Sequence, residues 1–245
     1  MNLKKKAKRR FEVATRMELD YRRAIRKLTQ QINHMIKGMQ QPDGTIDTGL
    51  LNRMLRKYSE TIQPWAESVA SKMIAKVAAV NESNWIQSSQ DLGKELKKEL
   101  QTAPTAQFFA EMKREQVKLI TSLPIEAAER VHHLVMEAQL SGKRADEIAK
   151  EILRTGEVTS NRAKLIARTE VARTAASLTQ VRAKHIGSTH YIWRTSQDGD
   201  VRESHKKMAN KVIAWDSPPE VDPGKRYHAG MFPNCRCYPE PIINE

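Results

Sequence analysis

Apolar residues recur every three or four positions through most of the chain, which is the spacing of one face of a helix. The first stripe predicts an amphipathic helix that ends near Gly38, because the turn-forming sequence Pro-Asp-Gly follows at 42–44. The members of this stripe are Met17, Tyr21, Ile25, Leu28, Ile32, Met35 and Met39.

A second stripe runs from Leu51 to Val80 and passes through Pro64. Because proline removes a helical hydrogen bond, the pattern predicts either one kinked helix or two helices. Further helices are expected over residues 92–100, 106–122, 124–140 and 145–154, with Gly142 and Gly156 as stops. A long helix should follow, with Thr159 or Ser160 as N-cap and Gly187 directly after its end.

The residue pattern changes after Gly187, where the helical spacing of apolar residues ends. "THYIWRTS" and "VIAW" are β-branched and aromatic and predict short strands, "QDGD" between them predicts a turn, and "DSPPEVDPG" predicts a proline-rich loop. The fold class expected is therefore α+β, with a predominantly helical N-terminal region followed by a small α+β C-terminal domain of short strands.

Positive charge is concentrated at the N-terminus. The net charge is +13, and residues 1–40 contain twelve basic and three acidic side chains. Such a surface binds nucleic acid without reading sequence, although a solvated segment that only aids solubility is an alternative. The residues expected to contact DNA are Lys4, Lys5, Lys6, Lys8, Arg9 and Arg10.

Two function classes find no support in the sequence. No apolar run approaches the roughly 20 residues of a membrane-spanning helix, and charged residues stand where a signal peptide would be apolar. No zinc-finger spacing or recognisable recognition helix appears, so sequence-specific reading of bases is not expected.

Both cysteines, Cys235 and Cys237, lie near the C-terminus. At i and i+2 on an extended strand their thiolates point the same way, and imidazoles from His205 and His228 would complete a tetrahedral zinc set. Two buried thiols acting as small apolar side chains are the competing interpretation.

Catalysis is a third possibility. The pair of cysteines with a histidine could serve as a nucleophile, and Asp198, His205 and Glu170 could hold a divalent metal for phosphodiester hydrolysis. No local catalytic motif, such as His-Glu-x-x-His or a phosphate-binding loop, supports either idea.

Three blocks in register resemble a known family: "RAKLIARTEVARTAA", "YIWRTSQDGDVRESHKKMANKVI" and "PNCRCYPEP". Over about residues 140–241 the chain resembles the phage Mu protein F-like family, minor head proteins required for head morphogenesis in tailed double-stranded DNA phages. The residues that carry the resemblance include Arg168, Glu170, Trp193, Asp198, Arg202 and Asn234.

The resemblance implies a non-enzymatic structural protein of a phage or prophage. It implies a Mu F-like minor head domain over 141–245. Residues 1–140 lie outside the resemblance, and the sequence pattern alone predicts a basic helical region there, for which portal and DNA contact are expected. Portal protein, the procapsid interior and non-specifically bound double-stranded DNA are the implied partners, with no membrane and no small-molecule substrate. The protein would lie inside the virion capsid, after assembly in the host cytoplasm.

The resemblance also favours a structural zinc ion at the terminal cysteines. A metal-dependent nuclease or related hydrolase using Asp198, His205 and Glu170 is the alternative function. A third hypothesis is that the protein is a prophage-derived carrier of a toxin. This role would need a cargo domain after Glu245, and we expect none there.

Overall fold

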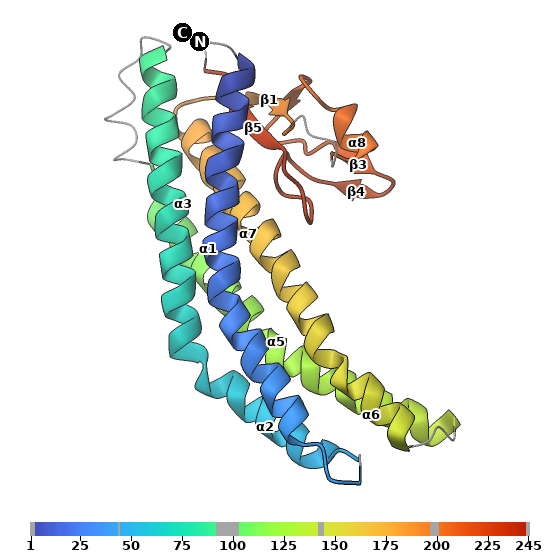
Figure 1. Ribbon diagram of the computed structural model, residues 1–245. Coiled ribbons are helices and arrows are strands. Elements are labelled where there is room, and N and C mark those ends of the chain that lie inside the picture. The colour runs from blue at the N-terminus through green and yellow to red at the C-terminus, as the bar shows by residue number, and fades with distance from the viewer. Residues whose placement is uncertain (1–2, 44, 92–102, 142–144, 197–200, 244–245) are drawn as a thin grey trace. The chain divides into compact units, whose positions relative to one another are not determined.

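The computed structural model describes residues 3–43, 45–91, 103–141, 145–196 and 201–243. Helices occupy most of the chain as far as His185, and short strands follow, which confirms the expected α+β class (Figure 1). The long helices are α1 (Leu3–Gly38), α2 (Thr48–Thr61), α3 (Gln63–Asp91), α5 (Thr105–Ser141), α6 (Ala145–Leu153) and α7 (Thr155–His185). The C-terminal elements are β1 (His190–Arg194), α8 (Glu203–Lys206), β2 (Val212–Ala214), β3 (Glu220–Asp222), β4 (Lys225–Arg226) and β5 (Tyr238–Pro241).

Contacts within the chain divide it into two compact units. Unit 1 comprises Met1–Leu19, Ser71–Lys113 and Arg168–Glu245, and unit 2 comprises Asp20–Ala70 and Arg114–Ala167. Each unit is thus assembled from segments that are distant in sequence. The division follows spatial contacts, and the boundary expected at residue 140 stays a prediction.

The first stripe forms the buried face of α1, which ends at Gly38 as predicted. Met17, Tyr21, Ile25, Leu28 and Ile32 are all buried. At the end of the stripe the expectation was wrong, because Ile36 is buried while Met35 and Met39 are only half-buried. A mixture of three- and four-residue steps follows one face of a helix with 3.6 residues per turn, and Ile36, four residues after Ile32, lies on that face.

The two internal prolines behave differently. At Pro64 the chain forms two helices, α2 ending at Thr61 and α3 beginning at Gln63, so that the proline falls in a first turn where no N–H is needed. Pro124 lies inside α5, so the separate helices expected over 106–122 and 124–140 were wrong. Leu123 and Ala128 beside it are fully buried, and that packing offsets a helix-interior proline, which costs about 3 kcal/mol.

The bounds of α7 correct one prediction and confirm another. The helix begins at Thr155, before the expected N-caps Thr159 and Ser160, and Gly156 lies in its first turn instead of ending α6. A Cβ at residue 156 would come within 2.1 Å of Asn33 Oδ1, so close packing in unit 2 accounts for the glycine. The helix expected over 92–100 and the stop at Gly142 lie outside the described residues.

Gly187 follows the end of α7 as predicted. Its φ is +81°, its N–H donates to the Lys184 carbonyl at 3.0 Å, and the Ser188 N–H donates to the Ala183 carbonyl at 2.9 Å. These two bonds form the Schellman arrangement that satisfies the last carbonyls of a helix. They turn the chain directly into β1.

The small sheet of unit 1 has the order β2-β1-β5, with both pairs antiparallel. The predicted strands around Trp193 and Ile213 are confirmed, whereas part of the predicted proline-rich loop forms the hairpin β3–β4. The turn expected at 197–200 lies outside the described residues. Trp193 and Tyr191 are fully buried and lie in the core that these elements share.

The outer edge of β5 lacks backbone donors at two positions. Ile242 N–H donates to the His190 carbonyl at 3.0 Å, so residues 190 and 242 are a hydrogen-bonded pair. Such pairs alternate along an antiparallel ladder, and Pro239 and Pro241, opposite Trp193 and Tyr191, therefore turn their backbone groups away from β1. Because proline has no N–H, a further strand finds no donors there.

Of the helices the structure describes, none carries an apolar stretch long enough to cross a membrane.

Candidate metal centre

His205 lies on the short helix α8 and is 2% exposed. Its ring is held edge-on between two aromatic rings, with centroid distances of 5.6 Å to Trp193 and 5.4 Å to Phe232. These contacts fix the plane of the imidazole. Its Nε2 atom is buried and has no hydrogen-bond partner among the described residues.

The two cysteines lie just before β5 in an extended segment. The residue before them, Asn234, has a φ of +60°, and its N–H donates to Thr169 Oγ1 on α7 at 3.0 Å. The Cys235 N–H donates to the Phe232 carbonyl at 3.0 Å. This turn brings both thiols into the core of unit 1, where Cys235 and Cys237 are buried.

The distances among the three side chains match those of a metal centre. Cys235 Sγ lies 3.4 Å from His205 Nδ1, and Cys237 Sγ lies 3.5 Å from the same nitrogen. With zinc–sulfur bonds of about 2.3 Å and zinc–nitrogen bonds of about 2.0–2.1 Å, a tetrahedral centre places nitrogen and sulfur about 3.5–3.6 Å apart. All three donor atoms lie within 4.8 Å of one another.

The two thiols are electrostatically coupled. A hydrogen bond from Cys237 lowers the pKa of Cys235, and burial opposes this effect. The same hydrogen bond raises the pKa of Cys237, and burial adds to that rise. The backbone N–H of Cys237 also donates to Cys235 Sγ at 3.3 Å. The site therefore stabilises negative charge on Cys235, as a thiolate ligand requires.

His228, the fourth ligand expected from the sequence, is not a member of this cluster. Its Nδ1 lies 3.1 Å from the Tyr191 hydroxyl, and its ring lies beside Tyr191 and Trp215. Burial lowers the pKa of His228, which favours the neutral ring. The structure thus brings together three of the four predicted ligands and gives the fourth a separate role in the core.

The residues of the alternative nuclease site are not assembled in the described part of the chain. Glu170 is buried on α7, where its Oε1 lies 3.4 Å from Arg173 Nη1, and it is not grouped with His205. Asp198 lies outside the described residues. No described arrangement therefore supports a carboxylate metal site at His205.

Two further residues of the resemblance, Arg202 and Asn234, hold in place the segment before β5 that carries Cys235 and Cys237, called the cysteine segment below. Arg202 donates to the Pro233 carbonyl at 3.1 Å, and its guanidinium lies 4.8 Å from the centroid of the Phe232 ring. Asn234 provides the bond to Thr169. Sequence reasoning did not single out Phe232 or Gly230, and only their place between the motif residues could have indicated a role.

Gly230 allows the cysteine segment to approach α7 closely. Its φ is +84°, and a Cβ there would lie 2.9 Å from Ala176 Cβ and 3.0 Å from the Cys237 carbonyl oxygen. A glycine is required both by the backbone conformation and by the space.

The expected DNA-contacting cluster from Lys4 to Arg10 belongs to α1. Its side chains lie outside the described set, so its role stays a prediction. Further along the same helix, Arg16, Arg26, Lys27 and Lys37 are exposed.

Comparison with known proteins gives two similarities. Residues 129–239 match the family described as Phage Mu protein F like protein. Over 249 aligned residues the chain is 26% identical to an uncharacterized protein of Haemophilus influenzae strain KW20, an alignment that includes 95% of this chain and 55% of that relative. The chain thus spans about half the length of the curated relative. No solved structure matches it.

The matched region includes the cluster of His205, Cys235 and Cys237, the neighbouring residues Arg202 and Asn234, and helix α7 as far as His185. Residues 129–239 therefore form a phage Mu protein F-like region.

Proposed function

We propose that this protein is a minor head protein of a tailed double-stranded DNA phage or prophage, acting in head morphogenesis. The observation that carries the proposal is the phage Mu protein F-like match over residues 129–239. In this role the protein associates with the portal and the procapsid interior, works without catalysis, and is carried in the virion.

The portal contact is tested by co-expression. The tagged protein, produced together with the portal and major capsid proteins of the same phage or prophage, is expected to co-purify with portal complexes and to be found in isolated procapsids. Co-expression with a portal protein from an unrelated phage is the control for non-specific retention. Absence from both portal complexes and procapsids of its own phage would contradict the proposed role.

Contact with packaged DNA is the second part of the proposal. It is supported by the net charge of +13 and by the basic residues along α1. Cations on one helix neutralise phosphates and release counterions, a gain that does not depend on base sequence. We therefore propose that α1 is the DNA-contacting element of the protein.

Substituting Lys4, Lys5, Lys6, Lys8, Arg9 and Arg10 with glutamine should weaken duplex binding and flatten its salt dependence. The slope of log K against log salt is negative, and each lost phosphate contact makes it shallower by about 0.9. Gel shifts between about 50 and 200 mM salt measure this slope. The matched control replaces six exposed lysines elsewhere, namely Lys57, Lys72, Lys76, Lys118, Lys150 and Lys164. Equal effects of both sets would refute a specific role for the N-terminal cluster.

We also propose that His205, Cys235 and Cys237 hold a structural zinc ion. The proposal is supported by the nitrogen–sulfur distances of 3.4 and 3.5 Å and by the burial of all three side chains. With His205 Nδ1 directed at the sulfurs, the neutral tautomer protonated at Nε2 leaves a lone pair for the metal. When bound, the ion would supply a cross-link and no reaction.

Such a cross-link would join two parts of the chain that are distant in sequence. It fastens the segment before β5 to α8, more than twenty-five residues earlier in the sequence. The strands of this region are only two to five residues long, so metal binding to the folded state adds stability that the small core alone provides poorly. His205, Cys235 and Cys237 thereby position the end of the phage Mu protein F-like region.

A further inference from the structure

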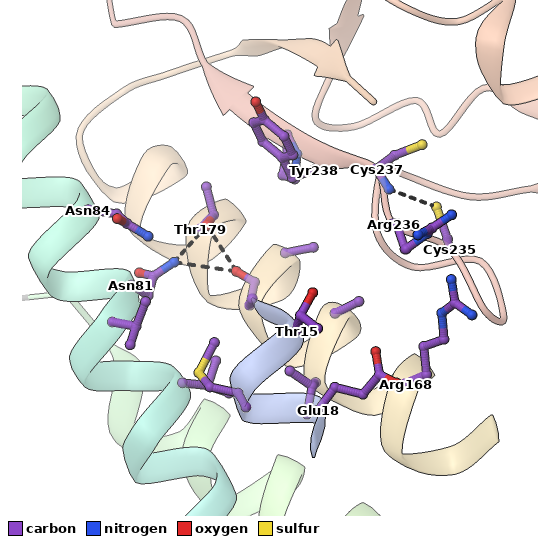
Figure 2. A pocket seen from close by; sticks show the side chains of 18 of the residues that line it. Thr15, Glu18, Asn81, Asn84, Arg168, Thr179, Cys235, Arg236, Cys237 and Tyr238 are labelled. Atoms are coloured by element: carbon purple, nitrogen blue, oxygen red, sulfur yellow. Dashed lines mark hydrogen bonds between the residues drawn. The ribbon is translucent and has the colours of Figure 1, made fainter. Parts of the chain in front are cut away.

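A cavity of about 160 Å³ lies in unit 1, beside the cysteine segment (Figure 2). Its walls come from α1, α3 and α7, from the cysteine segment and from β5. Along α7 the lining residues Arg168, Ala172, Ala175 and Thr179 follow one another at three- or four-residue steps. At 1.5 Å per residue, this row runs for about 16 Å along the helix.

The middle of the cavity is apolar. Ala172, Ala175 and Val171 on α7 line it together with Val77 and Val80 on α3. Small residues on α7 leave this space unfilled, while their neighbours Val77 and Ala176 are buried. A cavity of this size accommodates one or two apolar side chains rather than a whole helix, which is about 10 Å wide.

At one end of the cavity, the polar side chains form hydrogen bonds with one another. Asn81 Nδ2 donates to Thr179 Oγ1 at 2.8 Å, and Asn81 Oδ1 accepts from Arg182 at 2.8 Å. Thr179 Oγ1 in turn donates to the Ala175 carbonyl at 2.9 Å. Figure 2 shows Asn81 and Thr179 joined by a hydrogen bond at one side of the cavity.

The other end carries an unsatisfied donor. Arg168 Nε is buried and has no hydrogen-bond partner among the residues that the structure describes. The charged residues lining the cavity are Arg168, Arg236 and Glu18, which leave a net charge of +1. Figure 2 shows the side chains of Arg168 and Arg236 together on the side of the cysteine segment. A carboxylate matches the charge of this end, and a guanidinium is the side-chain group that most often pairs with one.

The cavity is adjacent to a sheet edge that cannot receive another strand. Pro239 and Pro241 line it, and their outward backbone positions have no N–H to donate. An occupant is therefore recognised through its side chains and not by adding a strand to β5.

We propose that this cavity receives an anchor from a partner head protein: one or two apolar side chains next to an acidic residue whose carboxylate binds Arg168. The apolar walls, the net positive charge and the unsatisfied Arg168 donor together carry the assignment. The naming of a head protein as the source rests on the proposed function. The chemistry of the anchor rests on the cavity alone.

The test uses the full-length protein with ¹³C-labelled alanine methyl groups. Two probe peptides, acetyl-Phe-Leu-Glu-amide and acetyl-Phe-Leu-Gln-amide, are titrated separately, and dodecanoate serves as a lipid probe. The methyl signals of Ala172 and Ala175 are expected to shift, with the glutamate peptide binding about threefold to fivefold more tightly at low salt. This ratio of affinities is the effect expected of a partly exposed ion pair between the glutamate carboxylate and Arg168.

Two variants separate the roles of charge and space. Arg168→Gln should abolish the preference for the glutamate peptide and keep the apolar contact, whereas Lys211→Gln, an exposed site on the same unit, should leave the preference unchanged. Ala175→Leu fills the cavity and should abolish binding of both peptides. Ala79→Leu, at an exposed position of α3, should leave the binding of both unchanged. Thermal unfolding of each variant checks that unit 1 is folded.

Several outcomes would overturn the inference. Unshifted methyl signals would exclude the cavity as a site, equal affinity for the two peptides would exclude the carboxylate, and tighter binding of dodecanoate would assign the cavity to lipid. If the peptides bind but the protein is not recruited to procapsids, the cavity is a binding site and the proposed head role is refuted.

Discussion

Replacing Cys235 and Cys237 together with serine is expected to remove about one equivalent of zinc and to destabilise unit 1 by more than about 4 kcal/mol, because structural metal sites contribute directly to folding. At about 2–4 °C per kcal/mol, the melting temperature of unit 1 should fall by roughly 10 °C. Elemental mass spectrometry measures the metal. Tryptophan fluorescence follows the unfolding, since Trp85, Trp193 and Trp215 all belong to unit 1.

The two histidines provide a matched control. His205→Gln should lose zinc as the double cysteine variant does, because Nδ1 of His205 faces both sulfurs. His228→Gln should retain zinc, because His228 contacts Tyr191 instead. A wild-type protein without zinc, or zinc loss on changing His228 but not His205, would refute the proposed centre. In the first case the cysteines act as buried apolar side chains.

Gly230→Ala is expected to destabilise unit 1 by about 3 kcal/mol. Two causes act together: a left-handed backbone costs an L-residue about 1–2 kcal/mol, and overpacking costs about 1–3 kcal/mol. The new methyl group would collide with Ala176 Cβ at 2.9 Å and with the Cys237 carbonyl oxygen at 3.0 Å. Urea unfolding followed by tryptophan fluorescence measures the change.

Gly224→Ala is the matched control for this prediction. Gly224 has a φ of +72°, and a Cβ there would have no neighbour within 4 Å. It should therefore show the backbone cost alone, about 1 kcal/mol. Equal destabilisation by the two substitutions would mean that the cysteine segment moves away from α7 without cost. Gly230 would then not be needed for the close approach.

Local patterns in the sequence predicted the long helices well. Residues from Met17 to Ile32 repeat at helical spacing and are buried as expected, and Gly187 ends α7 with the predicted conformation. The errors arise where tertiary contacts override local preference. Packing around Leu123 keeps Pro124 inside α5, and the approach of Asn33 explains Gly156 without a helix stop.

The candidate metal site was predictable in residue type but not in full membership. Ligand chemistry and the i, i+2 spacing indicated Cys235 and Cys237, and sequence order alone did not distinguish His205 from His228. The distinction depends on which imidazole ring the fold directs toward the sulfurs, and the contacts of His205 with Trp193 and Phe232 orient that ring. The cavity beside them could not be predicted, because alanines on α7 indicate helix packing as readily as empty space.

The prolines of β5 have a consequence for the protein at high concentration. Exposed sheet edges with free N–H groups tend to join copies of a chain into aggregates. Pro239 and Pro241 remove the N–H donors from the outer side of this strand. Copies of the protein that crowd together are thus prevented from polymerising through this edge. The outer side of β5 is therefore a poor template for β-linked fibres.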